Sequence, residues 1–315
     1  MKAIVLKTFG GVENFIYQNI EKPEIKESEV LIKVKAISIN PVDAKVRNKK
    51  APLAEDLVHF EPLILGWDIS GEVVGVGSKV TEFKIGDEVF GMVNFVGHGK
   101  GYAEYVAVPA EHLALKPGNI SHIEAAASTM AALTAWQAFD SYGKLRPTDK
   151  VFIHAASGGV GHFAVQIAKH IGAYVIATSS TSNRDFVLQQ GADEHIDYRT
   201  THFEEVLKDI DFVLESVGGE NFQKSVQILK PFGTIVALNS GVTEVDKLCA
   251  QTKHLHACYF MSVYSGSRDI RYIASLLEMG ILKPHISYVF DFDEIARAHL
   301  QIETGRTVGK IVVKL

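Results

Sequence analysis

The pattern of apolar and polar positions changes near residue 121 and divides the chain into two kinds of structure. Before that point, residues 30–37 alternate apolar and polar side chains, which is the period-two pattern of a half-buried strand. Residues 102–108 form another strand-like stretch, and glycines between 66 and 91 separate short runs of valine. Glycine marks tight turns, so we predict a mostly antiparallel β unit for this part of the chain.

Beyond residue 121, helical and strand-like segments alternate. An alanine-rich helix is predicted at 123–139, and strands are predicted at 150–154, 173–178, 195–197, 211–215 and 233–238, with helices between them. This alternation is typical of βαβ units on a parallel sheet. A strand is expected at 255–264 and a helix at 269–279. Two last strands, at 286–290 and 309–313, differ from the repeat and are candidates for returning to the first unit.

Composition narrows the functional classes. The chain has 315 residues, which is typical of about two domains, and a net charge of -5 without basic blocks, which disfavours nucleic-acid binding. Two cysteines, Cys249 and Cys258, are too few for a disulfide framework, so we expect a cytoplasmic protein. No stretch is long and apolar enough to span a bilayer, and the N-terminus lacks the features of a signal peptide, so no membrane partner is expected.

The strongest motif lies where a predicted strand meets a predicted helix. Residues 151–161 are V-F-I-H-A-A-S-G-G-V-G, a G-x-G-x-x-G pattern with alanine in its first position. Glycine lets a pyrophosphate approach backbone N–H groups at the start of a helix, where the macrodipole favours anions. The motif predicts a dinucleotide site at Ser157, Gly158, Gly159 and Val160. A tight strand–helix turn without a ligand is the alternative.

The end of the next strand distinguishes the two nicotinamide cofactors. NAD sites carry an acidic residue there, whereas this chain has T-S-S-T-S-N-R at 178–184. Hydroxyls, an amide and a guanidinium suit a 2′-phosphate, so NADPH is favoured, with Ser179, Ser180, Asn183 and Arg184 beside it. A capping box formed by Ser182 and Asp185 is also possible, and the two roles are compatible.

Five motifs in order resemble the medium-chain dehydrogenase/reductase superfamily. They are G-W-D-I-S-G-E-V-V-G-V-G at 66–77, K-I-G-D-E-V-F-G at 84–91, G-Y-A-E-Y-V-A-V-P at 101–109, A-A-S-G-G-V-G at 155–161 and G-K-I-V-V at 309–313. Within it, the chain is similar to the zinc-independent quinone oxidoreductases and enone reductases. The resemblance implies an α/β fold: a GroES-like β-rich catalytic domain (1–127 and 267–315) and a Rossmann NADP-binding domain with a doubly wound parallel sheet (128–266), with the active site in the cleft between them.

The resemblance also bears on metal binding. Zinc-dependent members carry Cys-x-x-Asp and Gly-His-Glu stretches, but the matching residues here are N-P-V-D at 40–43 and G-W-D at 66–68. Zinc prefers thiolate and imidazole ligands, so no metal is expected. His98, between two glycines, is interpreted as part of a flexible surface loop and not as a ligand.

Without a metal, hydride chemistry needs an electrophile that supplies its own electron sink. A quinone or an α,β-unsaturated carbonyl compound does so, whereas a simple alcohol–ketone pair does not. We therefore expect NADPH-dependent reduction of a quinone or enone. A cofactor sensor or nucleic-acid-binding protein on the same scaffold, with little catalysis, and a zinc-free alcohol dehydrogenase are the alternatives.

The resemblance assigns further residues. Asn40 is expected beside the nicotinamide and the substrate carbonyl, with Asp43 and Lys45 as catalytic candidates, although Asp43 can equally be a structural turn acceptor and Lys45 a surface charge. Thr134 and Tyr198 match cofactor positions, with a self-bonded helix hydroxyl and a surface aromatic residue as the respective alternatives. The remaining expected cofactor contacts are Ser216, Val217, Leu238, Asn239, Ser240, Phe260, Met261, Ser262, Gly309 and Lys310. For 260–262 the alternative is an ordinary buried strand, and for Lys310 it is a surface charge.

The family resemblance also implies an assembly. Members commonly pair the edge strands of two Rossmann domains into one continuous sheet, and the predicted strand at 255–264 would do this here. Its apolar residues agree with burial by a partner, because an open apolar edge invites aggregation. We therefore expect a homodimer.

Overall fold

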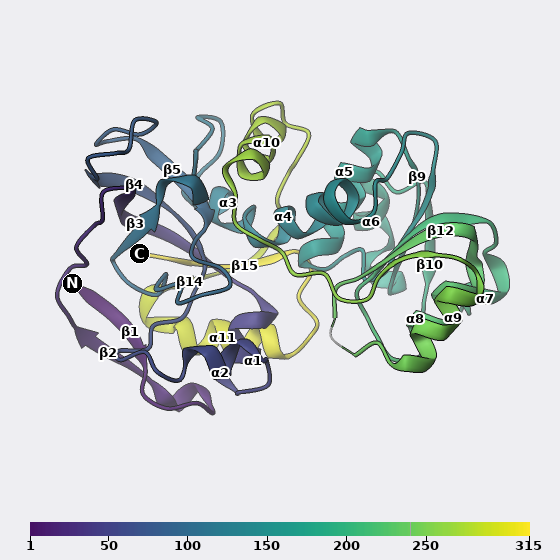
Figure 1. Ribbon diagram of the computed structural model, residues 1–315, viewed down its shortest axis with the longest axis horizontal. Helices are drawn as coiled ribbons and strands as arrows, with labels where there is room; N and C mark the ends of the chain where they lie inside the picture. The colour runs from purple at the N-terminus through teal and green to yellow at the C-terminus, as the bar shows by residue number, and fades with distance from the viewer. Residues whose placement is uncertain (240) are drawn as a thin grey trace. The chain divides into compact units, whose positions relative to one another are not determined.

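A computed structural model of the chain describes residues 1–239 and 241–315, which form two units (Figure 1). The first unit comprises Met1–Leu133 and Tyr264–Leu315, and the second comprises Thr134–Val263. Ser240, one of the expected cofactor contacts, lies outside the described residues. Within the described residues, no helix is long and apolar enough to cross a membrane.

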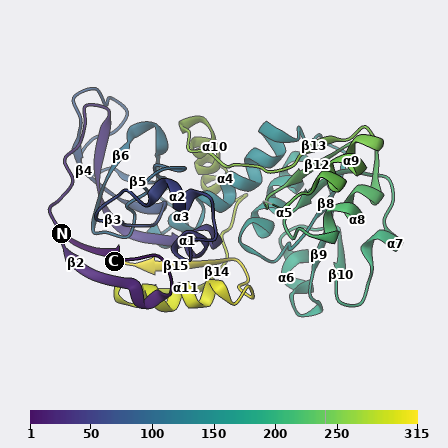
Figure 2. The same cartoon turned by 60° about the horizontal axis from the view of Figure 1, so that its bottom comes forward.

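The first unit is built on a mixed β-sheet whose strands come from both ends of the chain. The strand order is β14 (Ile286–Asp291), β15 (Lys310–Lys314), β3 (Glu29–Ile39), β4 (Asp68–Val76), β5 (Glu88–Met92) and β7 (Ala114–Leu115), and β6 (Tyr105–Pro109) also pairs with β3. All these pairs are antiparallel except β14 with β15. The predicted return of the C-terminal strands is confirmed, because β15 pairs with β3. A separate hairpin joins β1 (Lys2–Leu6) and β2 (Phe15–Asn19), which lie side by side in Figure 2.

The helices of the first unit are mostly short. They are α1 (Pro41–Arg47), α2 (Leu53–Leu57), α3 (His122–Ala127), α10 (Ser267–Glu278) and α11 (Ile295–Glu303). The helices α1, α2 and α11 were not expected from the apolar pattern. Short helices carry little periodic signal, but α1 does have a local signature: Asn40 at its N-cap and Asp43 at N3 form a capping box, and Pro41 occupies N1.

The predicted helical structure of 123–139 is confirmed for most of its residues, but the segment is not one continuous helix. The segment is divided into α3, α4 (Met130–Gln137) and a π-helical turn (Ala138–Tyr142), with a break at Ser128 and Thr129. The break leaves the backbone N–H of Met130 directed at a buried carboxylate, that of Asp68, at 3.0 Å. A contact with a residue 62 positions away thus decides the local structure, which no periodicity could reveal.

The second unit has a six-stranded, all-parallel sheet. Its order is β10 (Glu194–Asp197), β9 (Tyr174–Ser179), β8 (Lys150–Ile153), β11 (Ile210–Glu215), β12 (Leu229–Ala237) and β13 (His256–Cys258). The helices are α5 (Gly159–Ile171), α6 (Arg184–Gln189), α7 (Phe203–Val206), α8 (Glu220–Ile228) and α9 (Glu244–Thr252). Figure 1 shows α5 and α6 on one face of the sheet and α8 and α9 on the other. The order reverses between β8 and β11, the arrangement of a doubly wound Rossmann sheet.

The predicted strand at 255–264 is much shorter in the structure. Only His256–Cys258 pairs with β12, and residues 259–266 are irregular. The preceding helix, α9, was not predicted, although Thr243 and Asp246 form a capping box at its start. Its sequence is short and polar on most positions, so the apolar pattern is weak. The β13 strand does lie at the edge of the sheet, as expected.

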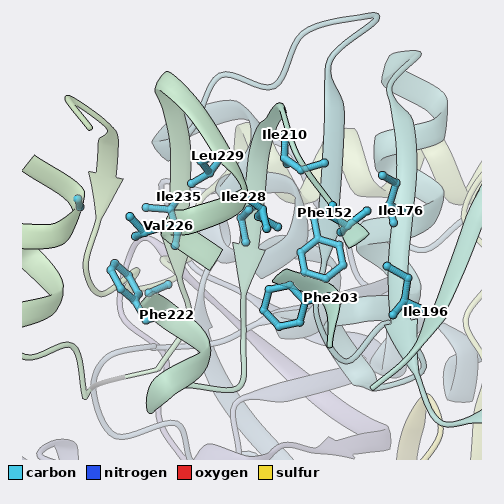
Figure 3. Close-up of a cluster of buried hydrophobic side chains, with 14 residues drawn as sticks. Phe152, Ile176, Ile196, Phe203, Ile210, Phe222, Val226, Ile228, Leu229 and Ile235 are labelled. Atoms are coloured by element: carbon cyan, nitrogen blue, oxygen red, sulfur yellow. The ribbon is translucent and has the colours of Figure 1, made fainter. Parts of the chain in front are cut away.

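A cluster of buried apolar side chains fills one side of the parallel sheet (Figure 3). Phe152 of β8 packs against Phe203 of α7, with ring centroids 5.0 Å apart. Phe222 and Val226 of α8 complete the cluster from the next helix. The core therefore fixes the strand ends from which the loops of the second unit emerge.

Candidate functional site

The polar centre of the first unit begins with Asn40, which ends β3 and caps α1. The side chain of Asp43 accepts a hydrogen bond from the backbone N–H of Asn40 at 2.8 Å and thereby caps the N-terminus of α1. The Asn40 side chain, only 4% exposed, is left to face its neighbours across the sheet.

Sheet register places two charged side chains beside Asn40. In the ladders, Ile311 pairs with Ile39 and Asp68 pairs with Ser38, so β15, β3 and β4 carry Lys310, Asn40 and Asp68 to the same end of the sheet. The Asn40 Nδ2 donates to Asp68 Oδ2 at 2.7 Å, and Lys310 Nζ donates to Asn40 Oδ1 at 2.5 Å. Lys310 Nζ also lies 3.9 Å from Asp68 Oδ2.

Burial dominates the electrostatics of this cluster. It raises the pKa of Asp68 and lowers the pKa of Lys310, while the attraction between the two charges opposes both shifts. The pKa of Asp43 is raised to about 7, mainly by burial and further by the Asp68 charge, against the hydrogen bond from the Asn40 backbone. Asp43, Asp68 and Lys310 are therefore buried away from water, where a charged group is stable only if an opposite charge or a hydrogen bond compensates for its lost hydration.

A second polar layer lies next to Asp43. The hydroxyl of buried Tyr102 is hydrogen-bonded to His299 Nε2 at 2.9 Å. The same Tyr102 hydroxyl lies near the Asp43 carboxylate and lowers its pKa, against the effect of burial. Burial lowers the pKa of His299 to about 3, so its ring is neutral. The Tyr102 ring packs so closely on Gly66 (φ +91°) that a Cβ there would lie 2.2 Å from it. This contact explains the glycine directly before Trp67 and Asp68.

The structure separates the expected catalytic residues. Asn40 and Asp43 belong to the buried cluster, whereas Lys45, on the outer face of α1, is exposed. The structural role considered for Asp43 is present as the capping box, and the catalytic roles of Asn40, Asp43 and Lys45 stay predictions. The alternative that Lys310 is a surface charge is wrong, because its residue is 3% exposed. Sequence reasoning missed Asp68, whose only signal was its place in the G-W-D motif.

The donors around Asn40 do not fit zinc. They are one amide, two carboxylates and an ammonium, and none of them is the thiolate or imidazole that zinc prefers. Among the described residues, no group of three or more histidine, cysteine and acidic side chains could hold a metal ion. His98 is not on a loose surface loop: it packs on Phe60 at 4.4 Å and accepts from the Ile64 N–H.

The turn after β8 forms a cradle in the second unit. Gly158 precedes α5 as its N-cap, and the Ala156 N–H is bonded to the Thr178 carbonyl at the end of β9. A Cβ on Gly161 would lie 2.3 Å from the Ala155 carbonyl oxygen and 2.6 Å from Ala156 Cα, so only glycine fits there. The turn thus presents backbone at the start of a thirteen-residue helix, the geometry that accepts a pyrophosphate.

The residues expected around a 2′-phosphate lie at the end of β9 and in the loop after it, except Tyr198, which follows β10. The Asn183 Nδ2 donates to Ser157 Oγ at 3.1 Å, which ties this loop to the cradle, while Ser179 is bonded to His195. Ser180 is buried, Arg184 is exposed, and Tyr198 is 58% exposed.

Two charged neighbours of this loop were missed. The Asp197 carboxylate accepts from the backbone and the hydroxyl of Thr181. The Arg199 guanidinium lies beside the Tyr198 ring, 5.7 Å from its centroid. Asp197 ends β10 and Arg199 follows it, and the register places β10 beside β9, so the strand pairing was the signal that could have revealed them.

A buried carboxylate organises the remaining loops. Glu215, at the end of β11, accepts from the N–H groups of Val217 and Gly218 and from the Asn239 amide, all at 2.8–2.9 Å. It therefore brings together two of the expected cofactor segments. The other expected residues of this unit are not part of this cluster. Ser216 donates to the His154 carbonyl, the Met261 N–H donates to the Ala237 carbonyl, and the Ser262 carbonyl accepts from the Tyr142 hydroxyl. Phe260 is exposed, and Thr134 and Leu238 are half-buried.

Comparison with known proteins gives matches over the whole chain. Residues 26–118 match the family model of the alcohol dehydrogenase GroES-like domain, and residues 190–313 match that of a zinc-binding dehydrogenase. A 2-methylene-furan-3-one reductase of Solanum lycopersicum is 35% identical over 99% of this chain and 79% of its own length.

Solved structures agree in fold and sequence. The quinone oxidoreductase from Coxiella burnetii superposes with a TM-score of 0.93 at 35% identity, covering 100% of this chain and 99% of the other. The Escherichia coli quinone oxidoreductase complexed with NADPH has a TM-score of 0.89 at 26% identity, covering 100% of both chains.

The raised pKa of Asp43 makes a prediction about stability. Because the folded chain holds this proton more tightly than the unfolded chain, where the pKa is near 3.8, the free energy of unfolding should fall as pH rises from about 4 to about 7. Asp43→Asn cannot ionise and should remove that part of the decline, on the order of 4 kcal/mol. Urea unfolding at several pH values measures it. The exposed Asp56→Asn is the control, and parallel curves for wild type and Asp43→Asn would contradict the prediction.

Proposed function

The chain belongs to the medium-chain dehydrogenase/reductase superfamily, in its quinone oxidoreductase branch, and we propose that it is a zinc-independent, NADPH-dependent reductase of quinones or α,β-unsaturated carbonyl compounds. The observation that carries this proposal is the buried Asn40 amide, which Lys310 and Asp68 hold in place of a metal centre. The names of the relatives support it, since one is a 2-methylene-furan-3-one reductase and another is a quinone oxidoreductase complexed with NADPH.

The cofactor site is proposed on the second unit. The cradle fits a dinucleotide because Gly161 permits close packing and Gly158 opens α5 without a side chain. When bound, NADPH supplies a hydride. From the first unit we propose Asn40 and Gly309 as contacts. The proposed contacts of the second unit are Thr134, Ser157, Gly158, Gly159, Val160, Ser179, Ser180, Asn183, Arg184, Tyr198, Ser216, Val217, Leu238, Asn239, Phe260, Met261 and Ser262.

The substrate class follows from what the first unit offers. Hydride addition to a conjugated carbonyl places negative charge on its oxygen, and this charge is already delocalised through the double bond. A neutral amide donor backed by a buried cation is enough to stabilise it, so Asn40 is the proposed oxyanion donor. The Asp43 carboxyl, with its pKa of about 7, can hold or release a proton near neutral pH next to that amide, and Lys45 lies on the same helix but in contact with solvent.

Domain roles, location and assembly complete the proposal. The catalytic domain is assigned to 1–127 and 267–315 and the NADP-binding domain to 128–266. Cys249 and Cys258 are free and half-buried, which agrees with a reducing compartment, and the cytoplasm is the one we propose.

A homodimer through the edge strand β13 is proposed because this edge has no partner strand among the described residues.

The first experiment measures NADPH oxidation at 340 nm with 1,4-benzoquinone, 9,10-phenanthrenequinone and a small enone. We expect turnover of at least one substrate, unchanged by EDTA and slower with NADH, because the described residues assemble no group that could hold a metal ion and the loop from Ser180 to Arg184 contains no acidic residue. Loss of activity in EDTA would contradict zinc independence. Tight NADPH binding without turnover would favour the sensor, and oxidation of simple alcohols would favour the alcohol dehydrogenase.

Cofactor preference tests the loop after β9. Removing the guanidinium with Arg184→Ala should raise KM for NADPH about tenfold or more, the value of one charge-assisted hydrogen bond, and leave KM for NADH nearly unchanged. Arg146→Ala removes an exposed arginine elsewhere on the same unit and should change neither. Equal losses with both cofactors would show that Arg184 does not face a 2′-phosphate.

Assembly is tested by light scattering coupled to size-exclusion chromatography. If β13 pairs with its copy, the mass should be twice the 34.5 kDa of one chain across micromolar concentrations. The backbone groups of an edge strand and nearby apolar side chains such as Phe260, 56% exposed, would be covered in this way. A mass of one chain at all concentrations would exclude the dimer.

A further inference from the structure

We propose that Lys310 and Asp68 are positioning residues that lock the Asn40 amide in one orientation, so that its second N–H bond is kept available for the substrate oxygen. This inference rests on the proposed function. It gives Lys310 a role different from the cofactor contact that the family resemblance implies.

The hydrogen bonds allow only one orientation of the amide. Lysine can only donate, so the Asn40 atom facing Lys310 Nζ at 2.5 Å must be the carbonyl oxygen. The other side of the amide then presents nitrogen, and it donates to Asp68 Oδ2 at 2.7 Å. Turning the amide over would set two donors against each other on one side and two acceptors on the other.

Both partners of the amide are themselves held in place. The second oxygen of Asp68 accepts from the Met130 N–H in the break between α3 and α4. The Lys310 backbone donates to the His285 carbonyl at 2.8 Å. Gly309 has φ +65°, and a Cβ on it would lie 2.2 Å from that same carbonyl oxygen. Glycine at 309 therefore lets the chain approach His285 and start β15 with the Lys310 side chain beside Asn40.

One donor of the amide remains. The Asn40 side chain has two N–H bonds, and only one of them has an acceptor among the described residues, that of Asp68. The ammonium beside the carbonyl oxygen polarises the amide and strengthens the remaining N–H as a donor. Because the ammonium is buried, its charge also acts on a developing oxyanion with little screening by water.

The buried charges require a test that separates geometry from stability. Lys310→Met alone leaves Asp68 unpaired, so it should lower both Tm and kcat. The double variant Asp68→Asn with Lys310→Met removes both charges and should recover most of the lost Tm. We expect its kcat to stay about tenfold to a hundredfold below wild type with a much smaller change in KM for NADPH, because the amide is no longer oriented toward the substrate oxygen while the other cofactor contacts remain. Lys84→Met, an exposed lysine of the same unit, is the control.

Two outcomes of this experiment would overturn the proposal. Recovery of kcat together with Tm in the double variant would make the pair merely structural. A raised KM for NADPH at unchanged kcat in Lys310→Met would make Lys310 a cofactor ligand.

A wild type that turns over no substrate would refute the proposed function, so a spectroscopic measurement tests the orientation independently of activity. Protein labelled with ¹⁵N-asparagine gives an Asn40 side-chain pair, identified by its loss in Asn40→Asp. Its two protons should resonate far apart in wild type and in Lys84→Met, and should approach each other in Lys310→Met. An unchanged pair in Lys310→Met would contradict the inference.

Discussion

The first unit depends on burying the Lys310 ammonium together with the Asp68 carboxylate. Leaving Lys310 unpaired in this setting would cost several kcal/mol, and the same holds for Asp68. The fold meets the requirement by bringing the end of β3 and the starts of β4 and β15 to one level, so that the amide of Asn40 stands between the two charges and bonds to both. The capping box of α1, the break between α3 and α4 and the glycine before β15 all serve this arrangement.

In the second unit, the groups that need partners are backbone N–H groups at the strand ends and not buried charges. Its loops leave the carboxyl ends of parallel strands, where unpaired N–H groups would otherwise need water. Glu215 takes two of them and the Asn239 amide, and so holds two loops together from inside. The cradle after β8 does the opposite: it keeps its N–H groups accessible at the start of α5, with glycine where any side chain would collide. One loop is closed by a carboxylate of the protein and the other is suited to an anionic ligand.

The sequence predicts the architecture well and the polar centre poorly, for one physical reason. Alternation, glycine turns and the 151–161 motif are local, so the β unit, the parallel sheet and the cradle follow from neighbouring residues. Asp68 and Lys310 lie 28 and 270 positions from Asn40, and their pairing exists only through strand register. The same limit explains the helix prediction that failed at Ser128, where a distant carboxylate captures a backbone N–H. Lys45 is a catalytic candidate through the family resemblance, yet helix geometry places it on the outer face of α1.

The electrostatics of the centre bear on which reactions it can support. A zinc ion polarises a carbonyl strongly and suits substrates that cannot spread charge themselves. An amide donor backed by the Lys310 ammonium polarises a carbonyl less strongly than zinc does, because the Asp68 carboxylate partly neutralises that ammonium. Such a site gains most from a substrate whose oxygen acquires charge that conjugation already disperses. The pairing that makes Lys310 tolerable in the core therefore also limits the chemistry, and it limits it in the direction of quinones and conjugated carbonyl compounds.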